Sequence, residues 1–364
     1  MRILYVDLER EWRGGQSQAL LTVRGLRALG HDAQLVSVRE SPLARRTAAA
    51  GIPVHEVRKN ARRASATLLL RKLLSQQNYD VFHANEPHAL TAVWLAGAQE
   101  RTRIVVSRRV AYPLSASGLA GKRYQIARRI VAISHFVEKS VLESGVPHER
   151  LAIVYEGVEV PPLPTQEARQ QARRRWSVTE NEKLLGCIGY LLPEKGQEIA
   201  IRALSTIGTK VPRARLLLAG DGPCRAGLEA LVQQLGMQDK VIFAGFVEDV
   251  TQVYAALDVF VFPSLAEPLG TSLLAAMAWG LPVLAVASGG VPEYVKDGDN
   301  GLLAAQPDPE LFSAVMVRIS SDESLRITLG QNARRTIGER FSAERMVENT
   351  IRVYEGVLQE MKTG

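Results

Sequence analysis

Cysteines are scarce in this sequence, and long hydrophobic runs are missing altogether. The two cysteines, Cys187 and Cys224, are too few for a disulfide framework and lack the spacing of a metal-binding pair, so we expect a protein of the reducing cytosol. No apolar stretch approaches the ~18 residues of a transmembrane helix, so we expect no membrane span. The apolar run at residues 3–8 is too short for a signal peptide and is predicted to form a first β-strand.

Aromatic residues are also few, at 6% of the chain, and they form no platform between the basic residues. The net charge of +7 is concentrated in four segments, at residues 58–63, 108–109, 122–129 and 169–175. Such clusters suit phosphorylated substrates, an anionic membrane surface or nucleic acid, although a solvated helix surface is the simpler alternative for each. Because proteins that read nucleic-acid sequence combine basic with aromatic side chains, we expect no nucleic-acid partner.

The length and the hydrophobic pattern predict two α/β domains. A chain of 364 residues with 46% hydrophobic and 23% charged residues is globular and too long for one ordinary core. Short apolar runs alternate with helical runs, which indicates βαβ units and parallel sheets. We predict two Rossmann-like, doubly wound parallel-sheet domains facing a cleft, at residues 1–160 and 161–342, with the proline-rich segment 158–165 as linker. A last amphipathic helix within 343–364 is predicted to pack back toward the first domain.

Two glycine-containing turns lie where doubly wound sheets bind ligands, beyond the carboxyl ends of predicted strands. Gly14 and Gly15 follow the first strand, and paired glycines let backbone N–H groups approach a phosphate. Lys195 lies in GYLLPEKGQE, residues 189–198, from which its ammonium group can reach a ligand. The alternatives are a tight turn without a ligand for the glycines and a solvated side chain for the lysine.

The most informative stretch is EPLGTSLLAAMAWG, residues 267–280. Glu267 comes just after a predicted buried strand, DVFVFPS. Gly270, Thr271 and Ser272 then begin a helix, where N–H and hydroxyl groups bind phosphate. Since a carboxylate repels phosphate, we expect Glu267 to contact another part of the ligand, such as hydroxyl groups. The alternative is that Glu267 and Thr271 only cap the helix.

Two further groups of side chains resemble a metal site or a catalytic pair, but we interpret them as structural. His83, Glu86 and His88 are close together in HANEPH, yet they directly follow a strand and not a helix that would align them, so we expect no metal there. Ser134 and His135 follow another predicted strand. We interpret Ser134 as a helix N-cap and not as a nucleophile beside a base.

Taken together, these motifs resemble the retaining glycosyltransferases of family 4, of the bacterial cell-envelope or lipopolysaccharide-core type. The second half of the chain carries, in order, GYLLPEKG, LLLAGDGP, VIFAGFVEDV and YAALDVFVFPSLAEPLGTSLLAAMAWGLPVLAVASGGVPEYVKDGDNGLL. The first half carries RGGQSQAL, VAISHFVEKSVLESGVP and IVYEGVE. The resemblance implies the GT-B fold and transfer from a nucleotide-diphosphate sugar with retention of configuration. It also implies no metal and no cofactor besides that sugar substrate.

The resemblance also implies a role for individual residues. Glu267 matches the glutamate that holds hydroxyl groups of the donor sugar, and Lys195 matches the lysine on the donor diphosphate. Gly14 and Gly15 fall where the first loop approaches that phosphate. The other implied donor contacts are Gly270, Thr271 and Ser272 at the phosphate, and Tyr190, Phe246, Val247 and Leu269 at the sugar or nucleotide.

Three positions depart from the pattern of this family. Ala275 stands where a second acidic residue usually grips the ribose, and Tyr190 stands where a phosphate-binding arginine is usual. Arg109, within SRRV, replaces a histidine often found near the reacting centre, and we expect it to be catalytic. We hypothesise that Arg108 or Arg109 compensates for Tyr190 or binds a phosphorylated acceptor.

The sequence therefore predicts an enzyme that moves a sugar from a nucleotide donor to a glycan or lipid-linked acceptor in cell-envelope polysaccharide or lipopolysaccharide synthesis. Its place would be the cytoplasm, at the inner face of the membrane. The basic segment 121–131 could dock an anionic membrane or a phosphorylated glycolipid, or be an ordinary surface helix. Because of the substitutions at residues 190 and 275, a non-catalytic protein that binds nucleotide sugars is an alternative. A third alternative is a sugar-nucleotide epimerase, but the EPLGTSLLAAMA pattern argues against it.

Overall fold

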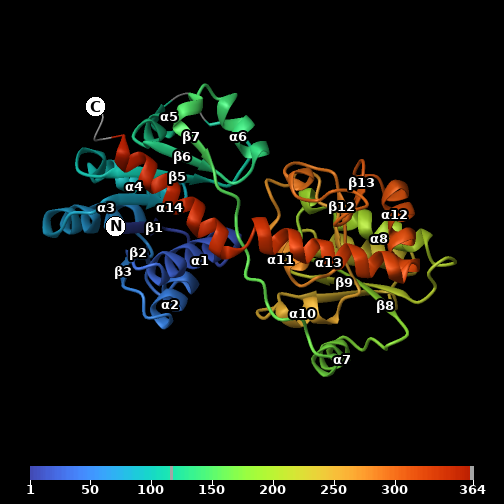
Figure 1. Cartoon of the computed structure of the whole chain (residues 1–364). Helices are drawn as coiled ribbons and strands as arrows, with labels where there is room; N and C mark the ends of the chain where they lie inside the picture. Colours follow the sequence, from blue (N-terminus) through green and yellow to red (C-terminus); the bar gives the residue numbers. More distant parts are fainter. Residues whose placement is uncertain (115–117, 361–364) are drawn as a thin grey trace. The chain divides into compact units, whose positions relative to one another are not determined.

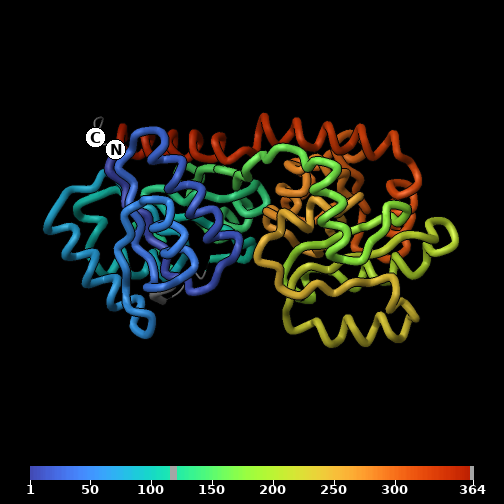
Figure 2. Tube along the Cα trace, turned by 90° about the horizontal axis from the view of Figure 1, so that it is seen from below, coloured from blue at the N-terminus to red at the C-terminus, as the bar shows by residue number. Residues whose placement is uncertain are grey.

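Two α/β units make up the chain in the computed structural model, which describes residues 1–114 and 118–360 (Figures 1 and 2). Unit 1 contains Met1–Gly157 together with the C-terminal helix, and unit 2 contains Val158–Ser342. Each unit has one sheet of parallel strands with helices on both faces, so the predicted fold class is confirmed. Among the described residues, every helix is too short or too polar to cross a bilayer.

Unit 1 has a seven-stranded sheet in the order β3-β2-β1-β4-β5-β6-β7. Its strands are β1 (Arg2–Asp7), β2 (Asp32–Val38), β3 (Val54–Val57), β4 (Val81–Ala84), β5 (Arg103–Arg108), β6 (Arg129–Ala132) and β7 (Leu151–Ile153). Its helices are α1 (Gly14–Ala28), α2 (Pro42–Ala49), α3 (Arg62–Gln76), α4 (Pro87–Leu95), α5 (Gly118–Gln125), α6 (His135–Leu142) and α14 (Ala343–Gln359). The strand order reverses between β1 and β4, and the carboxyl ends at such a switch point are where doubly wound sheets bind ligands.

The core of unit 1 has two layers because alternate residues of each strand point to opposite faces. Leu4 and Val6 of β1 pack on the side of α3 and α4, whereas Ile3 and Tyr5 pack on the side of α1 and α14. Near-continuous apolar strands are what a parallel sheet covered on both faces requires.

Unit 2 repeats this design with a six-stranded sheet in the order β10-β9-β8-β11-β12-β13. Its strands are β8 (Lys183–Ile188), β9 (Ala214–Ala219), β10 (Val241–Gly245), β11 (Val259–Phe262), β12 (Val283–Val286) and β13 (Leu302–Ala304). Its helices are α7 (Gln166–Arg175), α8 (Gln197–Thr206), α9 (Arg225–Gln234), α10 (Thr251–Ala256), α11 (Thr271–Ala278), α12 (Pro309–Ser321) and α13 (Glu323–Arg340). Here the order reverses between β8 and β11, which places a second switch point at the carboxyl ends of those two strands.

The last helix, α14, packs on α1 within unit 1, as both views show (Figures 1 and 2). Its buried face includes Met346, Val347 and Tyr354. A Cβ atom at Gly25 of α1 would lie 2.4 Å from Cγ2 of Val347, so the absence of a side chain at Gly25 permits the two helices to approach closely. Chain segments more than 300 residues apart thereby share one core.

We expect acid to destabilise unit 1 through His83, whose ring lies between the hydroxyl groups of Tyr354 at 2.6 Å and Ser107 at 2.7 Å. Burial, with a smaller contribution from the charge of Arg109, lowers the pKa of His83 from 6.5 to about 3. Below pH 6.5 the unfolded chain therefore binds a proton that the folded chain does not. The free energy of unfolding should then fall by about 1.4 kcal/mol for each pH unit below that value, until the folded pKa is reached.

Thermal unfolding between pH 8 and pH 4 measures this effect, with His83→Gln as the non-titrating comparison. The wild-type protein should lose stability more steeply with falling pH than the variant does. Parallel curves would show that another group controls the acid response.

Candidate functional site

A partly buried ion pair marks the switch point of unit 2. Lys195 ends the 3₁₀ turn η3 (Pro193–Lys195) that follows β8, and Glu267 lies in the loop after β11. The Nζ atom of Lys195 is 2.6 Å from Oε2 of Glu267, which also accepts a hydrogen bond of 3.0 Å from the hydroxyl group of Ser264. Glu267 is only 7% exposed, whereas the Lys195 side chain is 30% exposed. The two predicted residues are thus brought together, and the lysine is not merely solvated.

Close backbone contacts fix the lysine turn against the end of β11. Gly196 has φ of +66°, and a Cβ atom there would lie 2.1 Å from the carbonyl oxygen of Pro263. The N–H group of Leu265 donates to the carbonyl oxygen of Glu194 at 2.8 Å. Only glycine adopts this conformation at this distance without strain, so the GYLLPEKG turn is matched to the strand beside it.

A third loop supports Glu267 from the other side. The backbone N–H group of Gly290, after β12, donates to the carbonyl oxygen of Glu267 at 2.9 Å. Gly289 has φ of +55°, and a Cβ atom there would lie 2.0 Å from that same oxygen. The SGGVPE segment, whose Val291–Glu293 forms the 3₁₀ turn η4, therefore fixes the backbone of Glu267.

We expect Gly289→Ala to inactivate this site. The added methyl group must push apart the loops that carry Gly289 and Glu267, and it must adopt a left-handed conformation that costs about 1 kcal/mol even without a clash. A displacement of about 1 Å at Glu267 would lower turnover by roughly 100-fold.

The matched control is Gly298→Ala. Gly298 has a similar φ of +76°, but nothing lies within 4 Å of a Cβ atom there. Turnover assays and thermal unfolding of both variants separate the effects, since Gly298→Ala should lose some stability and retain activity. Equal activities in the two variants would contradict the role of the Gly289 contact.

The start of α11 presents open hydrogen-bond donors. Gly270 is the N-cap residue in a left-handed conformation, with φ of +100°, and no side chain caps the helix. Among the described residues, the backbone N–H groups of Thr271 and Ser272 have no acceptor. The alternative that Glu267 and Thr271 only cap this helix is therefore wrong, because the carboxylate of Glu267 is engaged by Lys195 and Ser264. Two N–H groups at a helix start favour an anion.

The other predicted donor contacts of unit 2 differ in accessibility. The side chains of Phe246 and Tyr190 are 75% and 53% exposed, so both are accessible. Val247 is 9% exposed and Leu269 is fully buried, so Leu269 can meet a ligand only through its backbone. Ala275 lies half-buried on α11.

At the switch point of unit 1, Gly14 and Gly15 do not form the expected turn but begin α1, with Arg13 as its N-cap residue. Neither glycine has a positive φ. Glycine therefore matters at these positions because it has no side chain, and not because of its backbone freedom. The carbonyl oxygen of Gly15 accepts from Nδ2 of Asn85 at 3.1 Å, and a Cβ atom at Gly15 would lie 3.6 Å from Cδ of Arg109.

Arg109 is held within unit 1 by two hydrogen bonds. Its Nε atom donates to Glu156 at 2.9 Å, and Nη1 donates to the carbonyl oxygen of Asn85 at 2.8 Å. The guanidinium side chain is 19% exposed and is paired with a nearly buried carboxylate. Its charge is therefore compensated internally, and its packing against Gly15 ties it to the start of α1.

A buried polar network that the sequence pattern does not single out joins β1 to β4. Nδ2 of Asn85 donates to Asp7 at 2.6 Å, Nε2 of Gln16 donates to the same oxygen at 3.0 Å, and the Tyr5 hydroxyl group donates to Asn85 at 2.8 Å. Burial raises the pKa of Asp7, against the opposing effect of these hydrogen bonds. Asp7 ends β1, and Asn85 directly follows β4. A polar residue at the end of an apolar run was therefore the sequence feature that could have indicated this network.

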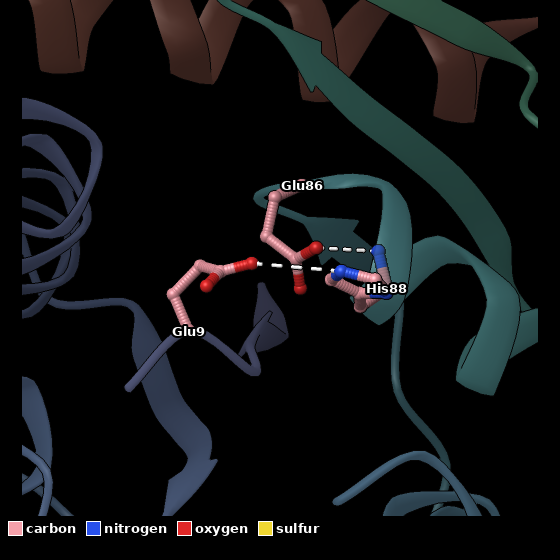
Figure 3. A group of neighbouring side chains, drawn as sticks. All are labelled: Glu9, Glu86 and His88. Carbon is pink, nitrogen blue, oxygen red and sulfur yellow. Dashed lines mark hydrogen bonds and ion pairs between the residues drawn. The ribbon is translucent and has the colours of Figure 1, made fainter. Parts of the chain in front are cut away.

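Glu9, Glu86 and His88 lie close together at the same edge, and Figure 3 shows their side chains turned toward one another. Their ligand atoms lie within 4.8 Å of one another, and Nε2 of His88 is 3.9 Å from Glu9. Glu86 is the N-cap residue of α4 and accepts from the N–H groups of Ala89 at 2.7 Å and of His88. Burial, followed by the charge of Asp7, raises the pKa of Glu86 to about 8. The role of Glu86 as N-cap residue of α4 thus explains its place in this group. His83 is not part of the group, because its ring contacts Tyr354 and Ser107.

The interpretation of Ser134 as an N-cap residue is confirmed. It precedes α6, and its hydroxyl oxygen accepts from the N–H group of Val137 at 3.1 Å.

Two family models match the chain, one on each unit. The model described as Glycosyltransferase Family 4 matches residues 12–160, and the model described as Glycosyl transferases group 1 matches residues 168–336. The chain belongs to the GT-B glycosyltransferases. The glycine-containing loops at both switch points lie inside the matched regions, and β1 precedes the first of these regions.

Curated relatives of this chain come from several organisms. It is 31% identical to the uncharacterized glycosyltransferase MJ1607 of Methanocaldococcus jannaschii, over 64% of this chain and 61% of that protein. It is 28% identical to the N-acetyl-alpha-D-glucosaminyl L-malate synthase of Bacillus anthracis, over 81% of this chain and 79% of the other. It is 35% identical to the lipopolysaccharide core biosynthesis glycosyltransferase LpsE of Rhizobium meliloti, over 44% and 46%. The match thus spans less than two thirds of the first and third of these relatives.

Among solved structures, Anabaena HepE in complex with UDP and glucose shares the fold of this chain. The TM-score is 0.85 at 22% sequence identity, and the match covers 98% of this chain and 99% of HepE.

Proposed function

We propose that the chain transfers a sugar from a nucleotide-diphosphate donor to a glycan or lipid-linked acceptor, with retention of anomeric configuration and without a metal. The observation that carries this proposal is the Lys195–Glu267 pair beside the open N–H groups of Thr271 and Ser272. A cation and a helix start offer two anchors for a diphosphate, and a carboxylate between them offers an acceptor for sugar hydroxyl groups.

Each group would act on a different part of the donor. The ammonium group of Lys195 and the start of α11 would bind the diphosphate and stabilise the negative charge that develops as it leaves. The carboxylate of Glu267, which accepts a hydrogen bond from Ser264 while the Gly290 N–H group binds the backbone carbonyl oxygen of Glu267, would orient the sugar. Exposed Phe246 and Tyr190 offer faces for the nucleoside. That HepE was solved with UDP supports a nucleoside diphosphate as the first ligand to test.

Retention follows from the resemblance to family 4, whose reaction is described as attack on the same face from which the phosphate leaves. In that description the leaving phosphate helps to deprotonate the acceptor. We propose that Arg109 supports this step indirectly, because its contacts with Asn85 and Glu156 position the start of α1.

The acceptor that we propose carries an anionic group and belongs to cell-envelope or lipopolysaccharide synthesis at the cytoplasmic face of the membrane. Arg108 is only 4% exposed, and within the described residues its Nε atom has no partner and no carboxylate pairs with it. An uncompensated buried guanidinium favours binding of an anion. The segment 121–131 adds basic side chains for an anionic membrane, and the LpsE relative acts in lipopolysaccharide core biosynthesis.

A panel of nucleotide sugars tests the proposal directly. We expect the wild-type protein to release nucleoside diphosphate from one donor, by transfer or slow hydrolysis, and Glu267→Ala to lose this activity. The proton coupling of the product's anomeric centre reports retention. Binding without release for every donor would favour the non-catalytic binder, and interconversion of two nucleotide sugars would favour an epimerase.

We expect Ala275→Glu to tighten nucleotide binding by about tenfold. The family pattern places a ribose-binding carboxylate at this position, and the half-buried Ala275 leaves that contact unmade. One hydrogen bond to a charged group contributes about 1.5–3 kcal/mol. Calorimetric titration with UDP measures the change, with Ala275→Gln as the uncharged comparison. Unchanged affinity would mean that this face of α11 does not reach the ribose.

A further inference from the structure

An arginine-lined groove of about 670 Å³ lies at the amino ends of β5, β6 and β7 in unit 1. Because the strands are parallel, this edge is opposite the one that carries Asp7, Asn85 and Gly15. The arginines that line the groove are Arg103, Arg128, Arg129 and Arg150. They come from the starts of three neighbouring strands, so the sheet itself sets their spacing.

The groove contains hydrogen-bonding groups without partners. Arg103 makes no side-chain hydrogen bond or ion pair within the part of the chain that the structure describes. Thr102 is 5% exposed, yet its hydroxyl group has no partner among those residues, and the same holds for Oε1 of Gln99. A buried hydroxyl group without a partner destabilises the folded protein, and a bound ligand that accepts its hydrogen bond would offset this cost.

The remaining arginines are partly engaged. Nη2 of Arg150 donates to the carbonyl oxygens of Tyr124 at 2.6 Å and Ala127 at 2.7 Å, and no carboxylate of the described residues forms an ion pair with it. Burial and the nearby charge of Arg128 lower the pKa of Arg150, a sign of crowded cations. Among the lining residues, four arginines face only two carboxylates, those of Glu149 and Glu360.

Glu360, at the end of α14, already supplies one anion to this groove. Its carboxylate accepts from Nε of Arg128 at 2.5 Å and from Nη2 of Arg129. Figure 1 shows α14 in unit 1 with β5, β6 and β7. The carboxylate therefore marks where an oxyanion fits between the two guanidinium groups.

We propose that this groove binds a phosphate-bearing ligand, which Arg103, Arg150 and the hydroxyl group of Thr102 recognise and which competes with Glu360 for Arg128 and Arg129. Phosphate suits the site because arginine forks bind its oxygens in pairs, and a hydroxyl group adds one more donor. Binding displaces the carboxylate of Glu360 and thereby loosens the last turn of α14. The groove is thus a second ligand site of unit 1, independent of the proposed donor site in unit 2.

Titration of the full-length protein with inorganic pyrophosphate, in the presence of saturating UDP to occupy the donor site, tests the proposal. Arg103→Gln breaks no bond in the folded chain, so it should fold normally and weaken binding by about tenfold. Glu360→Gln removes the competing carboxylate and should tighten binding by about threefold to tenfold. Arg352→Gln, an exposed change on the same helix, is the matched control and should bind as the wild type does.

Vesicles of phosphatidylglycerol in phosphatidylcholine distinguish a lipid headgroup from a free phosphate compound as the source of the ligand. If Arg103→Gln weakens vesicle binding as well, the headgroup is the source, and if only pyrophosphate binding weakens, a free compound is. Changes of opposite sign in Arg103→Gln and Glu360→Gln support the proposal in either case. Wild-type affinity in both variants, for both probes, would overturn it.

Discussion

Glu267→Gln should lower the rate of glycosyl transfer by about 10²–10³-fold. The substitution keeps the shape of the side chain but removes the charge that pairs with Lys195 at 2.6 Å and that would hold the sugar hydroxyl groups. Two hydrogen bonds to a charged group, at about 1.5–3 kcal/mol each, account for an effect of this size. The fold should survive, because glutamine still accepts from Ser264 and because Lys195, at 30% exposure, can be solvated.

Single-turnover rates with the donor found in the panel measure this loss, together with thermal unfolding. Glu198→Gln is the control, since Glu198 lies on α8 as an exposed partner of Arg202. We expect the control to match the wild type. If Glu267→Gln retained more than a tenth of the wild-type rate, Glu267 would not hold the sugar in the transition state.

Lys195→Met should produce the second large effect, a loss of about 10²–10³-fold in kcat, which is typical when one charge-stabilising group of an active site is removed. It should also weaken binding of free UDP by about tenfold or more, because the ammonium group would contact the diphosphate itself. Glu267→Gln, in contrast, should leave UDP binding nearly unchanged, since its proposed partner is the sugar. The two variants thus separate phosphate binding from sugar binding.

Calorimetric titrations with UDP distinguish these outcomes, and Lys210→Met, at an exposed position, is the control. Lys195→Met also leaves the 7% exposed carboxylate of Glu267 without its cation, so we expect a stability loss of about 1–2 kcal/mol. The double variant Lys195→Met/Glu267→Gln should recover part of that stability but no activity. UDP binding equal to the wild type in Lys195→Met would rule out a role at the diphosphate.

The fold class could be predicted because the strands that matter are buried on both faces. ILYVDL and DVFVFPS are nearly continuous apolar runs, and they form β1 and β11, one at each switch point. The short edge strands β3 and β13 escaped prediction. They have four and three residues, and so short a strand lacks a distinct hydrophobic period.

The parts of the candidate site whose functional groups lie on one short segment of the chain could be predicted from the sequence. The GTS segment at the start of α11 and the lysine of GYLLPEKG each follow a strand, so the sequence order alone places them at the ligand-binding edge. The network of Asp7, Asn85 and Arg109 was only partly predictable. Its members lie on different strands, and their pairing depends on the order of those strands in the sheet.

The amino-acid sequence by itself determined the α/β class, the loops that bear the polar groups and the membership of the glycosyltransferase family. Those properties follow from hydrophobic periodicity and from motifs that are contiguous in the chain. Only the tertiary structure decided that Lys195 and Glu267 meet across 72 residues, that Gly289 packs against the backbone of Glu267, and that four arginines share one groove. Such contacts depend on strand order and on loops that approach too closely for a side chain at the glycine, which no local pattern of residues encodes.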